Sequence, residues 1–126
     1  MDCPKCTGKL EPTSYNDEIH LHRCDACAGL WCKPEMVVHM KQEWMAEAAI
    51  DTGDPRIGKR LDRFDNIECP EGHGRMRKMV DEEQSHVWYE QCSTCDGLFL
   101  DAGELTDLKY VTLMDRLRAL LKGPRR

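Results

Sequence analysis

The chain contains one cysteine-rich stretch twice. The segment at 24–31, CDACAGLW, returns at 92–99 as CSTCDGLF, and each copy has an upstream partner, CPKC at 3–6 and CPEGH at 69–73. Two sets of four sulfur or imidazole donors therefore follow one another along the chain. Such donor sets hold a metal ion, so this repeat constrains the fold more than any other feature of the sequence.

The spacing within each repeat predicts its metal ligands. In the first repeat, two Cys-x-x-Cys pairs are separated by 17 residues, which is typical of a four-cysteine zinc site. Iron is an alternative metal there, because a rubredoxin centre also uses four cysteines. The second repeat predicts three cysteines and one histidine, with His73 placed opposite Cys6 after one inserted residue, and His86 is the competing ligand. The predicted ligands are Cys3, Cys6, Cys24, Cys27, Cys69, His73, Cys92 and Cys95.

Composition explains why metal is needed. Charged residues make up 33% of the 126 residues and aromatic residues only 6%. A unit of about 35 residues rarely buries enough apolar surface to fold without metal or disulfides. The second residue is Asp and a ligand follows it, so we expect no signal peptide, a cytoplasmic location and reduced thiols. We therefore predict two zinc ions per chain, and the lack of a long apolar run argues against a membrane span.

Each repeat is predicted to form a β-hairpin. Residues 9–15 and 18–23 flank an Asn16-Asp17 turn, and residues 75–80 and 84–91 flank an acidic turn. Ile19 and Leu21 alternate with His20 and His22, so these histidines are expected to be exposed. Cys32 is the one cysteine outside the donor sets, and we expect it to be a small buried side chain.

Helices are predicted after both hairpins. The pattern at 34–50 begins with a proline and places Met36, Met40 and Trp44 on one stripe, and a second apolar stripe runs through 101–122. A short amphipathic helix is predicted within 56–65. The fold class is therefore a small metal-stabilised α+β protein with two zinc-ribbon hairpins, each followed by an α-helix. Its expected divisions are a first ribbon at 1–33, helix and linker at 34–68, a second ribbon at 69–101 and a C-terminal helix with a basic tail at 102–126.

Both repeats resemble the TFIIB-type zinc finger family. That family's pattern is Cys-Pro-x-Cys, a β-hairpin, and then Cys-x-x-Cys-x-Gly-x-Trp-Leu-Asp-x-Gly-Glu-Leu. The second repeat matches the latter half from Cys92 to Leu105 but departs from the pattern at 69–73. The first repeat has all four cysteines and departs after Trp31, where Cys32 and Lys33 replace Leu and Asp. The resemblance implies a zinc-ribbon fold and little about activity, because ribbons bind DNA, bind proteins or serve as structural parts.

Three classes of function follow. A four-ligand site leaves no position for a substrate, so we expect no enzyme and no small-molecule substrate; only loss of His73 from the ligand set would open one. The first class is a protein-interaction adaptor or regulator that binds a partner, or a second copy, through its helices. The second is a transcription-associated nucleic-acid-binding ribbon, favoured by basic residues at 56–63 and 116–126 but opposed by the net charge of −5. The third is a thiol-redox or metal-sensing protein.

Overall fold

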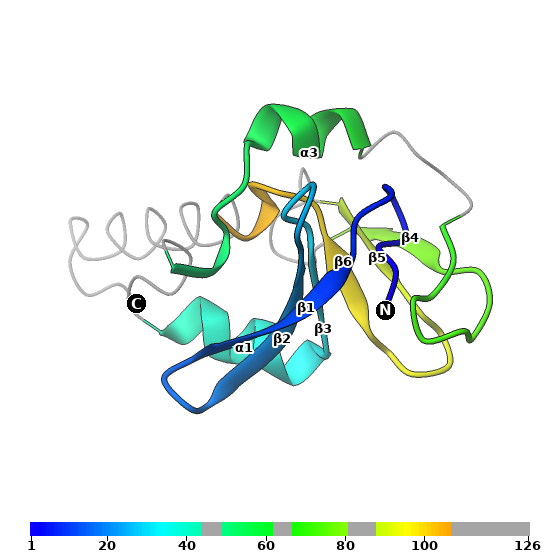
Figure 1. The fold of residues 1–126 in the computed structure, drawn as a ribbon. Coiled ribbons are helices and arrows are strands. Elements are labelled where there is room, and N and C mark those ends of the chain that lie inside the picture. The colour runs from blue at the N-terminus through cyan, green and yellow to red at the C-terminus, as the bar shows by residue number, and fades with distance from the viewer. Residues whose placement is uncertain (44–48, 62–66, 81–87, 107–126) are drawn as a thin grey trace, which may run out of the picture.

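A single antiparallel sheet contains both repeats (Figure 1). The structure is a computed structural model that describes residues 1–43, 49–61, 67–80 and 88–106. The strands lie in the order β1-β2-β3-β6-β5-β4, so each repeat supplies three neighbouring strands. The elements are β1 Leu10–Tyr15, β2 Ile19–Cys24, β3 Leu30–Cys32, α1 Pro34–Gln42, α3 Pro55–Leu61, β4 Arg77–Val80, β5 Trp88–Gln91 and β6 Leu98–Leu100.

The two predicted hairpins are confirmed. Strands β1 and β2 pair with Leu10 opposite Cys24 and Tyr15 opposite Ile19. The turn residues Asn16 and Asp17 have φ values of 56° and 60°. Three residues, 16–18, therefore connect the paired strands, and the two left-handed residues reverse the chain there. Strands β4 and β5 form the second hairpin, and its predicted acidic turn lies outside the described residues.

The sequence did not predict the strand pair that joins the repeats. Strands β3 and β6 run antiparallel, with Trp31 opposite Phe99 at the centre of their register. The same motif, Gly-Leu-aromatic, thus forms a central strand in each repeat. The two ribbons are arranged around this pair as approximate twofold mates, so neither has an independent sheet.

The glycines of the repeated motif make room for the aromatic side chain of the other repeat. A Cβ atom added at Gly29 would overlap the ring of Phe99, and one added at Gly97 would overlap the ring of Trp31. Trp31 and Phe99 are both buried. Each Cys-x-x-Cys-x-Gly segment therefore presents a bare backbone surface on which the partner ribbon's aromatic ring packs.

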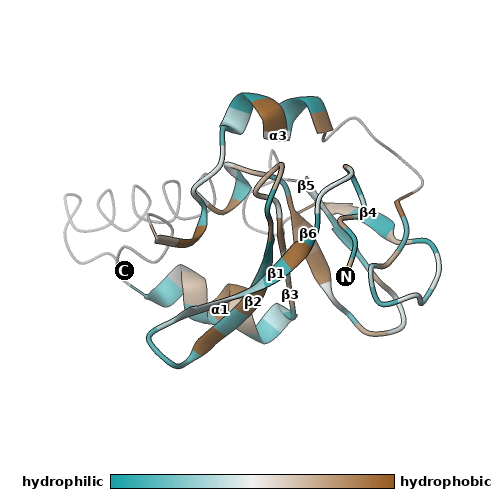
Figure 2. Cartoon of the chain, in the orientation of Figure 1, coloured by the Kyte–Doolittle hydropathy of each residue, from teal (hydrophilic) through white to brown (hydrophobic). Residues whose placement is uncertain are grey.

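Two clusters of buried side chains lie against the sheet, and Figure 2 shows hydrophobic colouring on its central strand β6. The helix-side core contains Leu30, Cys32 and Leu100, with Met36 and Val37 of α1 packed against it. The metal-side core contains the two central aromatic residues and five of the ligand cysteines, and the other two ligand cysteines pack against it together with Ile57 and Leu61 of α3. Strand residues of alternating parity supply the two cores, as the two-residue period of a strand requires.

Helix α1 occupies the first part of the predicted helix at 34–50. Pro34 begins it, and its N-cap, Lys33, makes no side-chain capping hydrogen bond. Met40 is fully buried and Met36 packs against the helix-side core. These two side chains therefore face the core of the same chain. Trp44 lies outside the described residues.

The segment between the repeats packs against the start of the predicted C-terminal helix. A Cβ atom added at Gly58 of α3 would overlap the backbone of Ala102. The Asp51 carboxylate accepts hydrogen bonds from the backbone N–H groups of Gly103 and Thr106, each at 2.9 Å. A helical turn begins at 104–106, and the rest of the predicted helix at 101–122 lies outside the described residues. The linker thus supplies the side-chain acceptor for the backbone donors at this turn.

Candidate metal centres

The four predicted ligands of the first site lie together. The sulfur atoms of Cys3, Cys6, Cys24 and Cys27 are all within 4.8 Å of one another. Cys3 Sγ lies 3.8 Å from Cys27 Sγ, and Cys6 Sγ lies 3.4 Å from Cys24 Sγ. None is in a disulfide, and three of the four are buried. The chain therefore presents four free thiols at a single point on the metal-side core.

The second site assembles as predicted from three cysteines and a histidine. The ligand atoms of Cys69, His73, Cys92 and Cys95 are also within 4.8 Å of one another. His73 presents its Nδ1 atom 3.4 Å from Cys69 Sγ. The imidazole is exposed, so the second site lies nearer to solvent than the first. The competing ligand, His86, lies outside the described residues.

One step of the sequence alignment is wrong. The two upstream loops, called the knuckles here, run from Cys3 to Gly8 and from Cys69 to Gly74 and have equal length. Each is closed by the same backbone hydrogen bond, from the cysteine N–H to the glycine oxygen, at 3.0 Å and 2.8 Å. No residue is inserted before His73, which therefore occupies the position after that of Cys6. An imidazole is longer than a thiol, so it reaches the site from one residue further along.

Backbone N–H groups point at the ligand sulfurs. Cys24 Sγ accepts bonds from Ala26 N and Cys27 N at 3.3 Å and 3.4 Å, and Cys92 Sγ accepts bonds from Thr94 N and Cys95 N at 3.4 Å and 3.5 Å. Such donors stabilise the ionised sulfur. The residue after each second cysteine, Ala28 or Asp96, has a φ near 60°, so both downstream loops adopt the same turn.

The pKa values of the thiols are spread widely within each site. A hydrogen bond from Cys27 lowers the pKa of Cys3 to about 5, whereas burial raises the pKa of Cys6 to about 11. Burial alone would raise the pKa of Cys92, but the N–H groups of Cys95 and Thr94 outweigh it and lower that pKa to about 6. Crowded thiols cannot all ionise without a compensating cation. A divalent ion supplies that charge.

The donor sets fit zinc. A tetrahedral ion with zinc–sulfur bonds of about 2.3 Å separates its sulfur ligands by about 3.8 Å. The Cys3–Cys27 and Cys69–Cys95 sulfur distances of 3.8 Å and 3.9 Å match this value, and the Cys6–Cys24 distance of 3.4 Å is shorter. Four thiolates, or three with an imidazole, are also the ligands that zinc prefers. Each set completes a tetrahedron with protein atoms, which is the arrangement of structural zinc sites.

The knuckle of the first ribbon is fixed by the second ribbon. Lys5 lies between the ligands Cys3 and Cys6, and its side chain is fully buried. Its ammonium lies 2.6 Å from Asp101 Oδ2 and 2.9 Å from Glu90 Oε2, both in the second ribbon. Burial by itself lowers the pKa of Lys5, but the two carboxylates raise it by more. A charged side chain next to one metal site thus closes the interface with the other ribbon.

The second knuckle makes the reciprocal contact. Glu71 follows Cys69 as Lys5 follows Cys3, and its Oε2 atom accepts a hydrogen bond from Trp31 Nε1 at 3.1 Å. The same oxygen lies 3.7 Å from the ammonium of Lys33, and both side chains are partly exposed. Each knuckle therefore contacts the ribbon to which it does not belong.

Sequence reasoning did not group the four charged residues of these contacts, Lys5, Lys33, Glu71 and Asp101. Asp101 and Glu104 have the spacing of a capping box, and Glu104 Oε1 accepts a hydrogen bond from the Asp101 N–H at 2.6 Å. The Asp101 carboxylate, however, contacts Lys5. The only signal in the sequence was a charged residue after each Cys-Pro, and that alone indicates no partner.

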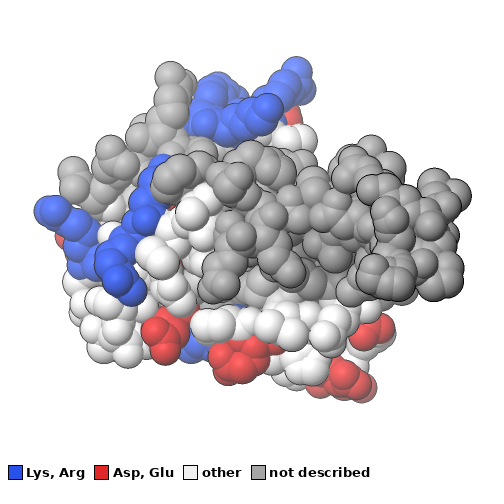
Figure 3. All heavy atoms as spheres, turned by 180° about the vertical axis from the view of Figure 1, so that it is seen from behind, with Lys and Arg blue, Asp and Glu red and all other residues white. Residues whose placement is uncertain are grey.

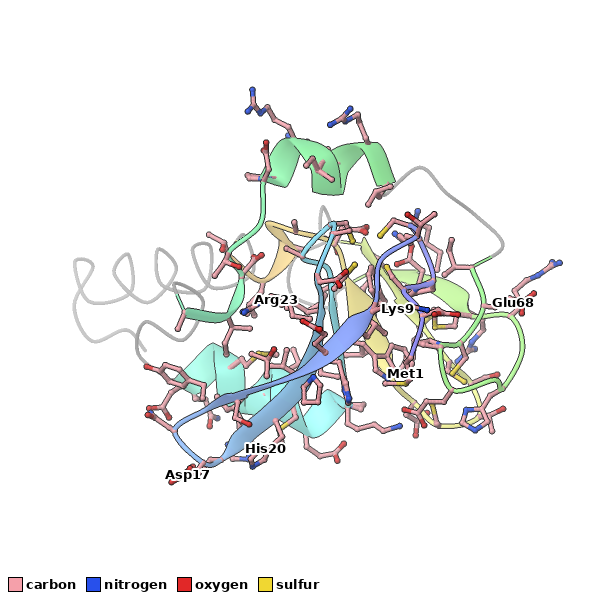
Figure 4. All side chains as sticks on the ribbon, in the orientation of Figure 1. Met1, Lys9, Asp17, His20, Arg23 and Glu68 are labelled. Carbon is pink, nitrogen blue, oxygen red and sulfur yellow. The ribbon has the colours of Figure 1, made fainter. Side chains whose placement is uncertain are left out.

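The remaining predicted side chains lie outside both sites. Cys32 is buried as expected, and burial raises its pKa to about 12, so it stays protonated and unreactive at neutral pH. His20 is exposed at the hairpin end that carries Asp17, and His22 is half-buried; neither belongs to a donor set. Figure 4 shows His20 and Asp17 far from Glu68, which immediately precedes the second knuckle.

These features define a tandem zinc-ribbon protein with two closed four-ligand sites. The chain belongs to the transcription factor zinc-finger family, of the TFIIB zinc-ribbon type. The family model matches residues 2–42 and 68–110, one copy for each repeat. Comparison with curated proteins and with solved structures found no match.

Replacing His73 tests the second donor set. His73→Ala removes one of four ligands, so we expect zinc content to fall from two ions towards one per chain, with the first site intact. His86→Ala is the control and is expected to keep both ions. Zinc measured per chain after dialysis against a mild chelator reads out the difference. Equal retention by both variants would mean that His73 is not a ligand.

Proposed function

We propose that this protein is a non-enzymatic adaptor or regulator that binds a protein partner through the outer face of α1. The closed ligand sets support a structural role for both metals, because neither leaves a coordination position for water or substrate. Among the described residues, no helix is long and apolar enough to cross a membrane. We expect the protein to act in the cytoplasm.

The outer face of α1 is the observation that carries this proposal. Glu35, Val38, His39 and Gln42 are exposed and follow one another at helical spacing, on the side opposite Met40. Val38 is 54% exposed, the highest value among the large hydrophobic side chains that the structure describes. An apolar side chain framed by polar ones is the usual composition of a transient contact surface.

Charge pairing favours a protein over a nucleic acid. Basic side chains gather over α3 in Figure 3, where Arg56, Lys59 and Arg60 are exposed. Arg56, however, forms an ion pair with Asp54 at 3.2 Å, and Lys9 pairs with Asp2. Phosphate binding would have to compete with these carboxylates, and the whole chain carries a net charge of −5. Nucleic-acid binding is therefore the second candidate.

Two exposed valines provide a matched test. Val38→Glu introduces a good helix former and places a charge on the outer face of α1. Val80→Glu makes the same change on β4, where Val80 is 36% exposed. Partners are captured with the parent chain from its host, identified by mass spectrometry and then purified. We expect Val38→Glu to weaken binding of such a partner about tenfold or more, a loss of about 1.4 kcal/mol. Val80→Glu should bind as the parent does.

Salt dependence separates the two candidate functions. We measure binding of the parent to duplex DNA at several salt concentrations. Weak binding of DNA at physiological salt, together with weaker binding of the protein partner by Val38→Glu than by Val80→Glu, supports the adaptor function. Sub-micromolar binding to DNA that falls steeply with salt would favour the nucleic-acid function instead.

A further inference from the structure

We propose that the two crossed contacts between the ribbons act as a charge code that selects which ribbons pair. The ribbon seam consists of strands β3 and β6 together with Lys5, Lys33, Glu71 and Asp101. Its charges permit a first ribbon to pair with a second ribbon and oppose the pairing of two like ribbons from two copies of the chain. This inference rests on the geometry of the seam and is independent of the adaptor function.

The four charged residues occupy equivalent positions in pairs. Lys5 and Glu71 are the third residues of two knuckles of equal length, and Lys33 and Asp101 directly follow β3 and β6. The antiparallel register around Trp31 and Phe99 gives the seam its approximate twofold symmetry. Each knuckle residue contacts the residue that follows the other ribbon's central strand, so the two contacts are symmetry mates.

The charges of these symmetry mates are reversed. In the first contact the knuckle residue is the cation, and Lys5 Nζ lies 2.6 Å from Asp101 Oδ2. In the second contact the knuckle residue is the anion, and Glu71 Oε2 lies 3.7 Å from Lys33 Nζ. Two first ribbons paired in the same way would bring Lys5 against Lys33 twice. Two second ribbons would bring Glu71 against Asp101 twice.

The apolar part of the seam lacks this discrimination. Both ribbons contribute a glycine that receives an aromatic ring, so packing alone would allow like ribbons to meet. The charges are therefore the part of the seam that distinguishes the partners. Because the side chains of Lys5 and Asp101 are fully buried, a like-charge contact at their position would be poorly screened by solvent.

The seam needs such selection because an unpaired ribbon exposes a strand edge. Leu30, Trp31 and Cys32 form a buried central strand only while β6 covers β3. Before the repeats meet, a second copy of the chain presents the same apolar edge. Natural sheets use charges to prevent edges from pairing wrongly.

Recombining the charges in the 126-residue chain tests the code. All chains carry Glu90→Gln, because Glu90 Oε2 lies 2.9 Å from Lys5 Nζ and would otherwise remain a partner for it. The first chain adds Lys33→Glu and Asp101→Lys, which makes both crossed contacts repulsive and both like-ribbon contacts attractive. The second chain adds Lys5→Glu and Glu71→Lys to these, which makes the crossed contacts attractive again. Both chains carry the substitutions at Lys33 and Asp101, so any loss of stability that these two changes cause by themselves affects both chains equally.

Light scattering after size-exclusion chromatography, with zinc content and thermal melting, reads out the result. We expect the first chain to form particles of at least twice the mass of the Glu90→Gln reference, and the second chain to return to the reference mass with two zinc ions. A first chain with the mass and melting of the reference would overturn the proposal. If the first chain precipitates, the second decides: recovery of the reference mass and zinc content supports the code, and failure to recover overturns it.

Discussion

Removal of both zinc ions is expected to unfold the described part of the chain. Structural zinc contributes about 10–16 kcal/mol in small finger peptides, whereas whole domains are stable by about 5–15 kcal/mol. Five of the ligand cysteines belong to the metal-side core and the other two pack against it, so loss of metal removes the anchor of that core as well. Neither hairpin has enough other apolar surface to compensate.

Chelation followed by circular dichroism and thiol titration measures this effect. The chain contains eight cysteines, of which seven are ligands and Cys32 is buried. We expect the zinc-loaded protein to protect its thiols and the chelated protein to expose all eight together with loss of strand signal. Metal analysis beforehand should give two zinc ions per chain and would also detect iron in the first site. A chelated chain that keeps its strands would contradict the structural role of the metals.

Replacement of Lys5 is expected to have the largest effect of any substitution that leaves the ligands in place. Lys5→Met keeps much of the side-chain volume but leaves Glu90 and Asp101 without the ammonium between them. Breaking a buried ion pair by removing one partner usually costs about 3–5 kcal/mol, because the remaining charge stays desolvated. All three side chains are at most 3% exposed, so solvent compensates little.

The matched control is Lys33→Met, which removes the lysine of the symmetry-related contact with Glu71. The side chains of Lys33 and Glu71 are 41% and 35% exposed, so we expect a loss of about 1 kcal/mol at most. Urea unfolding of the zinc-loaded proteins compares the two variants. Because the folded pKa of Lys5 lies above its ordinary value of 10.5, its contribution is complete below pH 10.5 and is lost only as the pH rises through that folded value. Equal effects of the two variants at neutral pH would contradict the buried role of Lys5.

The sequence determined the metal chemistry and the hairpins of this protein. Ligands such as Cys24 and Cys27 lie within one turn of chain, so their spacing alone places both sulfurs at one point. The Asn16-Asp17 turn and the alternation of Ile19 and Leu21 are equally local signals. The resemblance to the zinc-finger family could be recognised from the sequence because its pattern consists of the same local ligand spacings and hairpin.

Only the tertiary structure decided how the repeats combine. Strand β3 is three residues long, too short for its pattern to indicate a partner, and Trp31 meets Phe99 from across the chain. Lys5 and Asp101 are 96 residues apart. From the local sequence alone, a single charged residue after Cys-Pro, such as Lys5, is expected to be exposed to solvent. It becomes buried here because folding brings two carboxylates to it, and no local pattern in the sequence contains that information.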